Sequence, residues 1–368
     1  MIIGVTGTNG KTSTLYFLEQ LYKNVHKNIY TYGSRGFWKN QERIDRLGQN
    51  DPLALLLEEA RFNTPDCDFY FEAHSPFLKN DLYDGIQLDM AVLTKISNYE
   101  HTEYHENYEE YRQTKLKLFS KHLKENGVAI TNHKYLASVK EHTNCVVLTF
   151  GSESEAHCWY EIEKNNKDGV YFSLYYKDQR FSEICIPSAV FIPNFCAAIL
   201  CADSSGISIK SAIEISKRFS LPRGRHHRIK KYDKDIIIDF AHNPGGLLCL
   251  LKDIQLKSYA SVWTVFGCGG DRSKTKRPLM GKIAKRYSDV VIITEDQSRS
   301  ESTTSILDQI AQEDSSLIKI REREKAIKYA VYNAPKGAVI LVLGMGDDTY
   351  VFEGVEIGDY QLVKNISI

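Results

Sequence analysis

Residues 2–13 of the chain are IIGVTGTNGKTS, a short apolar run followed at once by a glycine-rich turn. The apolar residues predict a buried β-strand over Ile2–Val5, and the pattern after the turn predicts a helix over Lys11–Tyr22. Between such a strand and helix, exposed backbone N–H groups and the helix dipole favour a polyphosphate. The stretch therefore predicts a nucleotide-phosphate loop at the start of an α/β domain.

Two side chains of this loop have expected roles toward ATP: Lys11 reaches the β- and γ-phosphates, and Thr12 binds Mg²⁺. The strict G-x-x-x-x-G-K-T pattern fails because Val5 occupies the first glycine position, whereas T-G-T-N-G-K-T is intact. A glycine-rich turn without a ligand is the alternative, which the flanking strand and helix disfavour. The residues expected to bind the nucleotide are Gly7, Thr8, Asn9, Gly10, Lys11, Thr12 and Ser13.

Length, charge and cysteine usage limit the function classes. A chain of 368 residues exceeds one ordinary core and predicts two or three domains. Lys plus Arg and Asp plus Glu both number 47, which disfavours a nucleic-acid or anionic-membrane partner. The eight cysteines never form C-x-x-C, so reduced, buried thiols are expected. Without an apolar run of about 18 residues or a leader, a cytoplasmic location is predicted.

Strand and helix patterns alternate along most of the chain and predict an α/β fold. We expect a P-loop-type domain with a mostly parallel central sheet over residues 1–222, followed by a smaller Rossmann-like α/β domain over residues 223–368. Residues 145–186 alternate aromatic and polar side chains, which indicates an antiparallel flap or edge extension. The basic stretch at 221–235, LPRGRHHRIKKYDKD, predicts a linker in which His226 and His227 are solvated.

Residues 93–119, LTKISNYEHTEYHENYEEYRQTKLKLF, combine histidines, glutamates and lysines. His101 and His105 are four residues apart, as in a zinc protease, but Thr102 stands where H-E-x-x-H requires glutamate. Taken alone, most of the segment is typical of a solvated, charged helix.

Together with this segment and the phosphate loop, further motifs occur in the order found in the Mur ligase family. The sequence most resembles the MurE-type branch, which joins a diamino acid to a UDP-muramoyl dipeptide, and the resemblance extends over essentially the whole chain. The further motifs are YFEAHSPF, NFCAA, RGR, IIIDFAHNP, FGCGGDRSKTKRPLMG and TEDQSRSE.

The resemblance implies a metal and acceptor site around two of these motifs. Lys115 of YRQTK would be an N-carbamylated lysine that helps to hold a second Mg²⁺, the alternative being an exposed helix lysine. Glu72 and His101 match other metal-site positions, and bound metal would neutralise the triphosphate and the incoming carboxylate. His74 and Ser75 match positions that line the acceptor, although the family has serine where His74 stands.

In the second half of the chain the resemblance implies ATP contacts by Asn194 to adenine, by Arg225, and by Asp239 to ribose. An amino-acid substrate would be bound by Asp271, Arg272, Asp296, Arg299 and Asp348. In the family the arginine matching Arg299 grips the distal carboxylate of diaminopimelate, for which a guanidinium fork is suited. Alternatively, Arg299 only pairs with Glu295 or Glu301.

Two acceptor determinants of the MurE-type branch are expected to be missing: its N-terminal UDP-binding domain, and an arginine replaced here by Leu82. The resemblance and these departures from it therefore imply an ATP-dependent ligase that couples an amino acid with an anionic end to a carboxylate smaller than, or presented differently from, plain UDP-N-acetylmuramoyl dipeptide. One alternative is a cell-wall ligase in which a partner protein replaces the missing domain. Another is a non-catalytic ATP-binding regulator.

Overall fold

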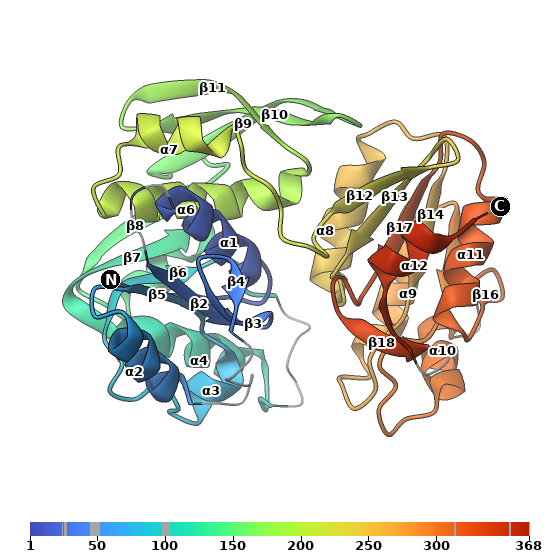
Figure 1. Cartoon of the computed structure of the whole chain (residues 1–368), viewed down its shortest axis with the longest axis horizontal. Helices are drawn as coiled ribbons and strands as arrows, with labels where there is room; N and C mark the ends of the chain where they lie inside the picture. The colour runs from blue at the N-terminus through green and yellow to red at the C-terminus, as the bar shows by residue number, and fades with distance from the viewer. Residues whose placement is uncertain are drawn as a thin grey trace. The chain divides into compact units, whose positions relative to one another are not determined.

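The structure is a computed structural model that describes residues 1–23, 25, 28–44, 52–97, 104–312, 314–352 and 355–367. Its internal contacts divide the chain into two compact units (Figure 1). The first unit comprises most of residues 1–220, and the second comprises residues 221–367 with the turn Asn165–Gly169. The functional boundary at residues 222 and 223 stays a prediction.

The first unit is built on one eleven-stranded sheet in the order β11-β10-β9-β8-β7-β6-β1-β5-β2-β3-β4. From β9 across to β2, neighbouring strands run parallel. The pairs β2–β3, β3–β4 and β10–β11 at the two edges are antiparallel. Their bounds are β1 Ile2–Thr6, β2 Ile29–Gly33, β3 Gly36–Lys39, β4 Glu42–Arg43, β5 Asp68–Glu72, β6 Leu88–Leu93, β7 Leu123–Asn132, β8 Val146–Gly151, β9 Cys158–Asn166, β10 Gly169–Tyr176 and β11 Gln179–Ile186.

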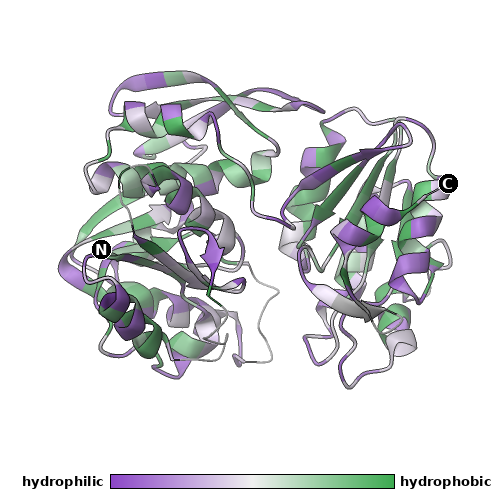
Figure 2. Ribbon diagram, viewed as in Figure 1, coloured by the Kyte–Doolittle hydropathy of each residue, from purple (hydrophilic) through white to green (hydrophobic). Residues whose placement is uncertain are grey.

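Strand β1 lies between β5 and β6, and all five of its residues are buried. This explains its unbroken apolar sequence, because a strand covered on both faces has no solvent side on which polar residues would alternate. In Figure 2 the central strands of both sheets are mostly hydrophobic, whereas the outer helices are mixed. The phosphate loop therefore starts from a fixed point in the middle of the sheet.

Seven α-helices are described in the first unit. Phe17 of α1 meets Phe195 of α6 edge-on, with ring centroids 6.2 Å apart, and stacks on Phe219 at 5.2 Å. This aromatic packing fixes α6 beside the helix that follows the phosphate loop. The bounds are α1 Lys11–Tyr22, α2 Leu53–Asn63, α3 Ser75–Lys79, α4 Tyr108–Ser120, α5 Leu136–Lys140, α6 Ile192–Ser204 and α7 Ile209–Ser216, with short 3₁₀ helices at His133–Tyr135 and Ala189–Phe191.

The second unit contains a six-stranded sheet in the order β12-β13-β17-β14-β15-β16, parallel except for β12 against β13. A separate hairpin pairs β18 with β19. The strands are β12 His227–Lys231, β13 Lys234–Asp239, β14 Val262–Phe266, β15 Val290–Ile293, β16 Ile318–Lys319, β17 Val339–Leu343, β18 Thr349–Phe352 and β19 Val355–Gly358. The helices are α8 Pro244–Gln255, α9 Lys276–Tyr287, α10 Thr303–Ala311, α11 Arg323–Asn333 and α12 Asp359–Asn365.

The predicted fold class, a mostly parallel central sheet followed by a smaller α/β unit, is confirmed. The linker prediction is wrong over its second half, because residues 227–239 form the β12–β13 hairpin. His226 is 7% exposed, and burial lowers its pKa to about 4. The His227 ring lies 4.6 Å from that of Tyr360. Neither histidine is a solvated linker residue, since each packs within the second unit.

All eight cysteines carry free thiols, but the expectation that they are buried is wrong for half of them. Cys185 is exposed, and Cys67, Cys145 and Cys249 are partly exposed. Within the described part of the chain, no helix has the length and apolar character needed to cross a membrane.

A buried ion pair in the second unit gives a test of the packing. Arg323 donates from Nε and Nη2 to the two carboxylate oxygens of Asp359, at 2.8 and 2.6 Å, and both side chains are at most 1% exposed. Asp359→Ala should lower the free energy of unfolding by about 3–5 kcal/mol, because it leaves a buried guanidinium without its counter-charge. Urea denaturation followed by circular dichroism measures the change.

The matched control is Asp308→Ala, which removes an exposed ion pair with Lys319 in the same unit. It should change the free energy of unfolding by no more than about 0.5 kcal/mol. Equal effects of the two substitutions would contradict the assigned burial.

Candidate active site

The phosphate loop is held in place by close contacts that only glycine permits. Gly7 and Gly10 have φ angles of 145° and 94°. A Cβ on Gly7 would lie 2.0 Å from Thr94 Oγ1, and one on Gly10 would lie 2.2 Å from Asn194 Nδ2. The Thr94 hydroxyl donates to the Asn9 carbonyl at 2.7 Å. The loop is therefore clamped from both sides, and its N–H groups stand at the start of α1, where a phosphate is favoured.

The other predicted loop residues are fixed within the same unit. Thr8 Oγ1 lies 2.9 Å from the Tyr111 hydroxyl, and its backbone N–H donates to the Lys95 carbonyl. Lys11 Nζ donates to the Gly7 carbonyl at 3.0 Å, and Ser13 is buried in the first turn of α1. Asn194 Nδ2 donates to the Gly10 carbonyl at 3.2 Å, so the residue predicted to contact adenine supports the loop itself.

Glu72, at the end of β5, meets the hydroxyl that was predicted to bind Mg²⁺. Its Oε1 accepts from Thr12 Oγ1 at 2.8 Å and from Ser34 Oγ at 3.2 Å. Gly33 makes this approach possible, because a Cβ there would lie 2.5 Å from the same oxygen. Sequence reasoning missed Ser34, whose only signal is its place directly after strand β2.

This donor set fits magnesium. A carboxylate and hydroxyls are hard oxygen ligands, which Mg²⁺ prefers. No group of three or more His, Cys, Asp or Glu side chains suited to a metal occurs among the described residues. Magnesium needs no such cage, because it usually binds through one or two carboxylates together with substrate phosphates. His101, the further predicted ligand, and its neighbour Glu100 lie outside the described residues.

Lys115 comes from α4 and enters the same site. Its side chain is 1% exposed, so the alternative of an exposed helix lysine is excluded. Nζ donates to the Gly7 carbonyl at 3.0 Å and lies 4.6 Å from the centre of the Tyr111 ring. The ammonium groups of Lys115 and Lys11 thus share one carbonyl oxygen at the phosphate loop.

His74 and Ser75 lie where β5 leads into α3. His74 Nε2 is 3.6 Å from Glu72 Oε2. Enclosure by the protein lowers the pKa of His74 to about 4 despite the opposing pull of the Glu72 carboxylate, so the imidazole is neutral at pH 7. Ser75 is 2% exposed, and its hydroxyl has no hydrogen-bond partner among the described residues. This segment therefore offers uncharged polar groups beside the Glu72 carboxylate.

In the second unit, Arg225 and Asp239 lie near one another at the β12–β13 end of the sheet. The Arg225 guanidinium lies 4.2 Å from the centre of the Phe240 ring. Asp239 accepts from the backbone N–H groups of His226 and Ala241 at 2.7 and 2.8 Å, and burial raises its pKa. Both oxygens of this carboxylate are thus engaged in holding the local backbone.

The predicted amino-acid residues fall on two loops that touch. Asp271 follows β14 and accepts hydrogen bonds from the Ser300 hydroxyl and backbone N–H. Arg299, after β15, donates from Nη1 to the Gly270 carbonyl at 2.7 Å and from Nη2 to Gln297 Oε1 at 3.0 Å. Within the described chain it forms no ion pair with Glu295 or Glu301, so that alternative is not supported. Arg272 is half-buried on the first loop.

Asp348 and Asp296 form an acidic group near the end of β17. A Cβ on Gly344 would lie 2.8 Å from Asp296 Oδ2, which places that carboxylate against the turn leading to Asp348. Burial raises the pKa of Asp348 to about 6, with a further rise from Asp347 and a smaller one from Asp296. Carboxylates gathered in this way favour a cationic ligand.

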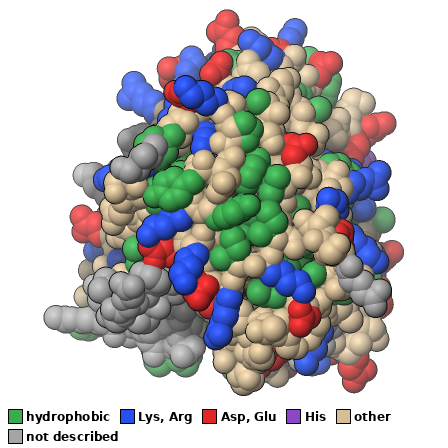
Figure 3. All heavy atoms as spheres, turned by 90° about the vertical axis from the view of Figure 1, so that its right-hand side faces the viewer, with side chains coloured by type: hydrophobic (Ala, Val, Ile, Leu, Met, Phe, Trp, Pro, Cys, Tyr) green, Lys and Arg blue, Asp and Glu red, His purple; other side chains and the backbone are tan. Residues whose placement is uncertain are grey.

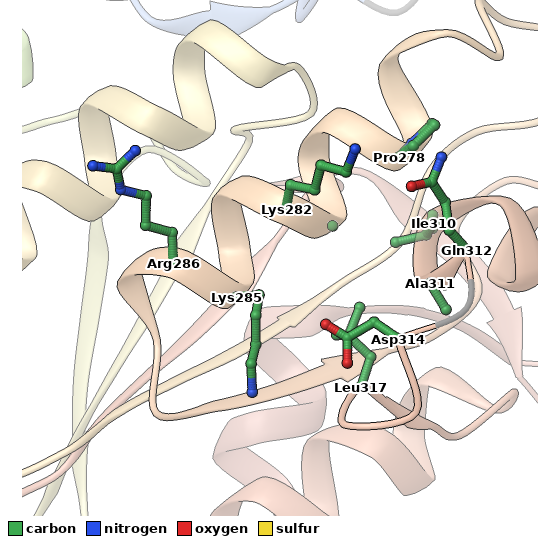
Figure 4. Close-up of a pocket in the computed structure, with 10 residues that line it drawn as sticks. Pro278, Lys282, Lys285, Arg286, Ile310, Ala311, Gln312, Asp314 and Leu317 are labelled. Carbon is green, nitrogen blue, oxygen red and sulfur yellow. The ribbon is translucent and has the colours of Figure 1, made fainter.

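One cavity of the described chain lies apart from these residues. It measures about 670 Å³ and opens between α9 and the end of α10 (Figure 4), and no predicted site residue lines it. The side chains of Lys282, Lys285 and Arg286 extend in different directions from α9, so they do not converge on one anion. The lining residues are Pro278, Gly281, Lys282, Lys285, Arg286, Ile310, Ala311, Gln312, Asp314 and Leu317.

The face that carries α11 shows hydrophobic side chains in its middle with Lys and Arg around them (Figure 3). On α11, Lys325 pairs with Glu322 and Lys328 with Glu324. These cations are therefore neutralised within their own segment and do not form an anion site.

Gly10 gives a direct test of the loop geometry. Gly10→Ala should weaken the binding of a fluorescent ATP analogue roughly 10- to 100-fold, because the new Cβ displaces Asn194 and the loop with it. Gly206→Ala is the matched control, since Gly206 has a φ of 90° but nothing within 4 Å of the added Cβ. It should cost about 1–2 kcal/mol of stability and leave nucleotide affinity unchanged. Equal loss of affinity in both variants would contradict the clamp.

Comparison with known proteins identifies the family of the chain. Residues 5–202 match the Mur ligase middle domain, and residues 224–346 match the Mur ligase, glutamate ligase domain. The UDP-N-acetylmuramoyl-L-alanyl-D-glutamate–2,6-diaminopimelate ligase of Caldanaerobacter subterraneus subsp. tengcongensis is 33% identical over 379 residues, which cover 99% of this chain and 77% of the relative.

Two solved structures are similar over more than nine-tenths of this chain. One is a UDP-N-acetylmuramoyl-L-alanyl-D-glutamate–2,6-diaminopimelate ligase with a TM-score of 0.65 and 26% identity, covering 99% of this chain and 77% of that one. The other is the Mycobacterium tuberculosis folylpolyglutamate synthase complexed with ADP and AMPPCP, with a TM-score of 0.76 and 15% identity over 93% of this chain and 88% of that one. The second likeness shows the fold alone.

The two domain matches, and an identity of one third over almost the whole chain, confirm the resemblance that the ordered motifs indicated: the chain belongs to the Mur ligase family and is an ATP-dependent carboxylate–amine ligase.

Proposed function

We propose that this ligase activates a small carboxylate with ATP and couples it to an amino acid that carries a second anionic group. The observation that supports this most directly is the joint placement of Lys11, Thr12, Glu72 and Lys115 around one glycine-clamped loop. A non-catalytic regulator would need the loop but not a buried lysine and a carboxylate beside it.

The chemistry proceeds in two displacements. A carboxylate oxygen attacks the γ-phosphorus of ATP, the bond to the β-phosphate oxygen breaks, and ADP leaves. The neutral amine then attacks the acyl carbon, inorganic phosphate leaves with its oxygen, and the nitrogen loses a proton to water. Lys11 and the loop N–H groups hold the phosphates and stabilise the charge that develops on them. Mg²⁺, held by Thr12 and Glu72, would neutralise the triphosphate.

Lys115 is suited to carbamylation. Its side chain is buried at the phosphate loop, with Nζ 3.0 Å from the Gly7 carbonyl oxygen, and it is the neutral form of a lysine amine that reacts with CO₂. Attack of Nζ on CO₂ forms the N–C bond and releases one proton, which converts a cation into a carboxylate-like group. That group would serve as a further oxygen ligand for a second Mg²⁺, in addition to His101.

For the amine side, Arg299 provides the group that binds a distal anion. Its hydrogen bonds to Gly270 and Gln297 use Nη1 and one N–H of Nη2, which leaves Nε and the other N–H of Nη2 to form a fork toward a carboxylate. Asp348 and Asp296 would receive an ammonium group. Asn194, Arg225 and Asp239 would contact the nucleotide, and Asp271 and Arg272 the amino acid.

The residues at positions that bind the acceptor carboxylate in the family differ in this chain. Leu82 is 55% exposed where the resemblance places an arginine for the muramoyl peptide, and His74 replaces a serine. These substitutions favour a carboxylate other than UDP-N-acetylmuramoyl dipeptide. The names of the relatives favour the dipeptide, with or without a partner protein, so both substrates belong in one screen.

Phosphate release identifies the substrates. Purified protein, ATP and Mg²⁺ are incubated with pairs of amines and carboxylates, including UDP-N-acetylmuramoyl dipeptide, 2,6-diaminopimelate and L-lysine, and product masses are measured. We expect release only when both partners are present, and faster release with diaminopimelate than with lysine. Turnover with simple apolar amino acids alone would contradict the anionic-end proposal, and no release with any pair would contradict the ligase.

Lys115→Ala should abolish product formation in the same assay, since the carbamate cannot form. Added formate or acetate should restore part of the activity by supplying the missing carboxylate, whereas Lys11→Ala should stay inactive with either acid. Full activity of Lys115→Ala without added acid would rule out a role for the carbamate.

The acidic group predicts a pH dependence. With a pKa of about 6, Asp348 is neutral below this value and charged above it. Its ability to bind an ammonium group therefore appears as the pH rises, and the KM for the amino acid should fall between pH 5 and pH 7. Asp348→Asn should remove this dependence. Asp347→Asn should shift the midpoint to lower pH, because the Asp347 carboxylate raises the pKa of Asp348; an unshifted midpoint would contradict the assignment.

A further inference from the structure

We propose that Arg277 and Glu301 are positioning residues, an ion pair that holds Asp271 and Arg299 in the conformation that binds the amino acid. The proposal rests on the proposed function only in taking Arg299 as the group that meets the substrate's distal anion. We call the segments 267–272 and 294–301 the first and second substrate loops.

The pair joins the two loops through a fork of hydrogen bonds. Arg277, in the first turn of α9, donates from Nη1 and Nη2 to the two oxygens of Glu301 at 2.8 and 2.7 Å. Its side chain has no exposed surface, and that of Glu301 is 15% exposed. Arg277 also donates to the Gly269 carbonyl at 3.2 Å and to Gln309 at 2.8 Å. One guanidinium thus binds both loops and helix α10.

Glu301 extends this connection to the substrate residues. Its Oε1, which accepts from Arg277, also accepts from the backbone N–H of Asp271 at 2.7 Å. The hydrogen bonds from Arg277 hold the pKa of Glu301 at about 2, so the carboxylate stays charged across the working pH range. The backbone of Asp271 is therefore bonded directly to this charged ion pair, and Arg299 lies two residues before its carboxylate member.

Both substrate residues have backbone conformations that need such support. Asp271 has a φ of 54° and Arg299 a φ of 48°, in the left-handed region that residues with a Cβ seldom adopt. Such conformations persist only when the surrounding structure imposes them, and they occur preferentially at ligand clamps. Two of them, on loops that the Arg277–Glu301 pair joins, indicate a preorganised binding site.

Backbone contacts leave the loops little other freedom. The Gly270 N–H donates to the Gln297 carbonyl at 2.8 Å. A Cβ on Gly270 would lie 1.8 Å from the Ser298 carbonyl oxygen, and one on Gly269 would lie 2.8 Å from Arg299 Nη1. The loops are in backbone-to-backbone contact, so a shift of either one moves the guanidinium of Arg299.

A comparison of two variants separates positioning from mere stability. Glu301→Gln breaks the fork and leaves a buried guanidinium unpaired, which should lower the melting temperature. The double variant Arg277→Met/Glu301→Leu has no unpaired charge and should recover most of that loss, because apolar residues of similar volume often replace a buried ion pair without cost. It cannot restore the hydrogen bonds to Asp271 and Gly269.

We therefore expect the KM for 2,6-diaminopimelate to rise roughly 10- to 100-fold in both variants, with the KM for ATP unchanged. Hydrogen exchange of peptides covering 267–273 and 294–302 should accelerate in both variants, whatever substrate is used. Asp235→Asn is the control, because it breaks the Arg228–Asp235 ion pair of the same unit without touching either loop; it should change neither quantity.

The proposal is overturned if the double variant recovers the wild-type KM and exchange rates together with its stability, because the pair then acts only on folding. Failure of the proposed function looks different: the wild-type enzyme would not distinguish diaminopimelate from L-lysine, which lacks the second carboxylate. The exchange rates would still decide whether the pair positions the loops.

Discussion

The site depends on the absence of two side chains at the end of strand β1. Because Gly7 and Gly10 lack a Cβ, Thr94 and Asn194 approach the loop from either side to distances at which any other residue would collide. The loop is consequently fixed before a ligand arrives, and the side chains that contact it are held in fixed positions as well. Glu72 reaches Thr12 past Gly33, and Lys115 reaches the Gly7 carbonyl from α4. Preorganisation of this kind spares the enzyme the entropy of ordering the loop on binding.

Charge is distributed differently in the two units. The first gathers cationic nitrogen around the loop, with Glu72 as the neighbouring carboxylate, which suits a polyphosphate and a metal ion. The second presents Arg299 on one pair of loops and carboxylates at Asp296 and Asp348, which suits a zwitterion. With 47 residues of each sign in the whole chain, this selectivity comes from local placement and not from the net field.

The fold and the phosphate loop could be predicted because their signals are local. An apolar strand, a glycine turn and a helix lie within residues 2–22, and the apolar residues of the strand and the helix indicate which side chains are buried. Arg277 and Glu301 are 24 residues apart in the sequence, and no helix or strand periodicity relates them. The sequence therefore contains no pattern that predicts their ion pair. His226 was misjudged because its neighbours are basic, whereas the β12–β13 hairpin turns it inward. Ser34 was missed because a single hydroxyl after a strand is common.

The glycines of the first substrate loop have a consequence for how such enzymes diverge. Gly267, Gly269 and Gly270 all face atoms too close to admit a methyl group. A Cβ at Gly267 or Gly270 would collide with backbone carbonyl oxygens of the second substrate loop, and a Cβ at Gly269 would displace Nη1 of Arg299. A related enzyme that uses a different amine substrate is therefore expected to differ in side chains on these loops, such as Gln297 and Arg299. The backbone of the loops is expected to stay the same.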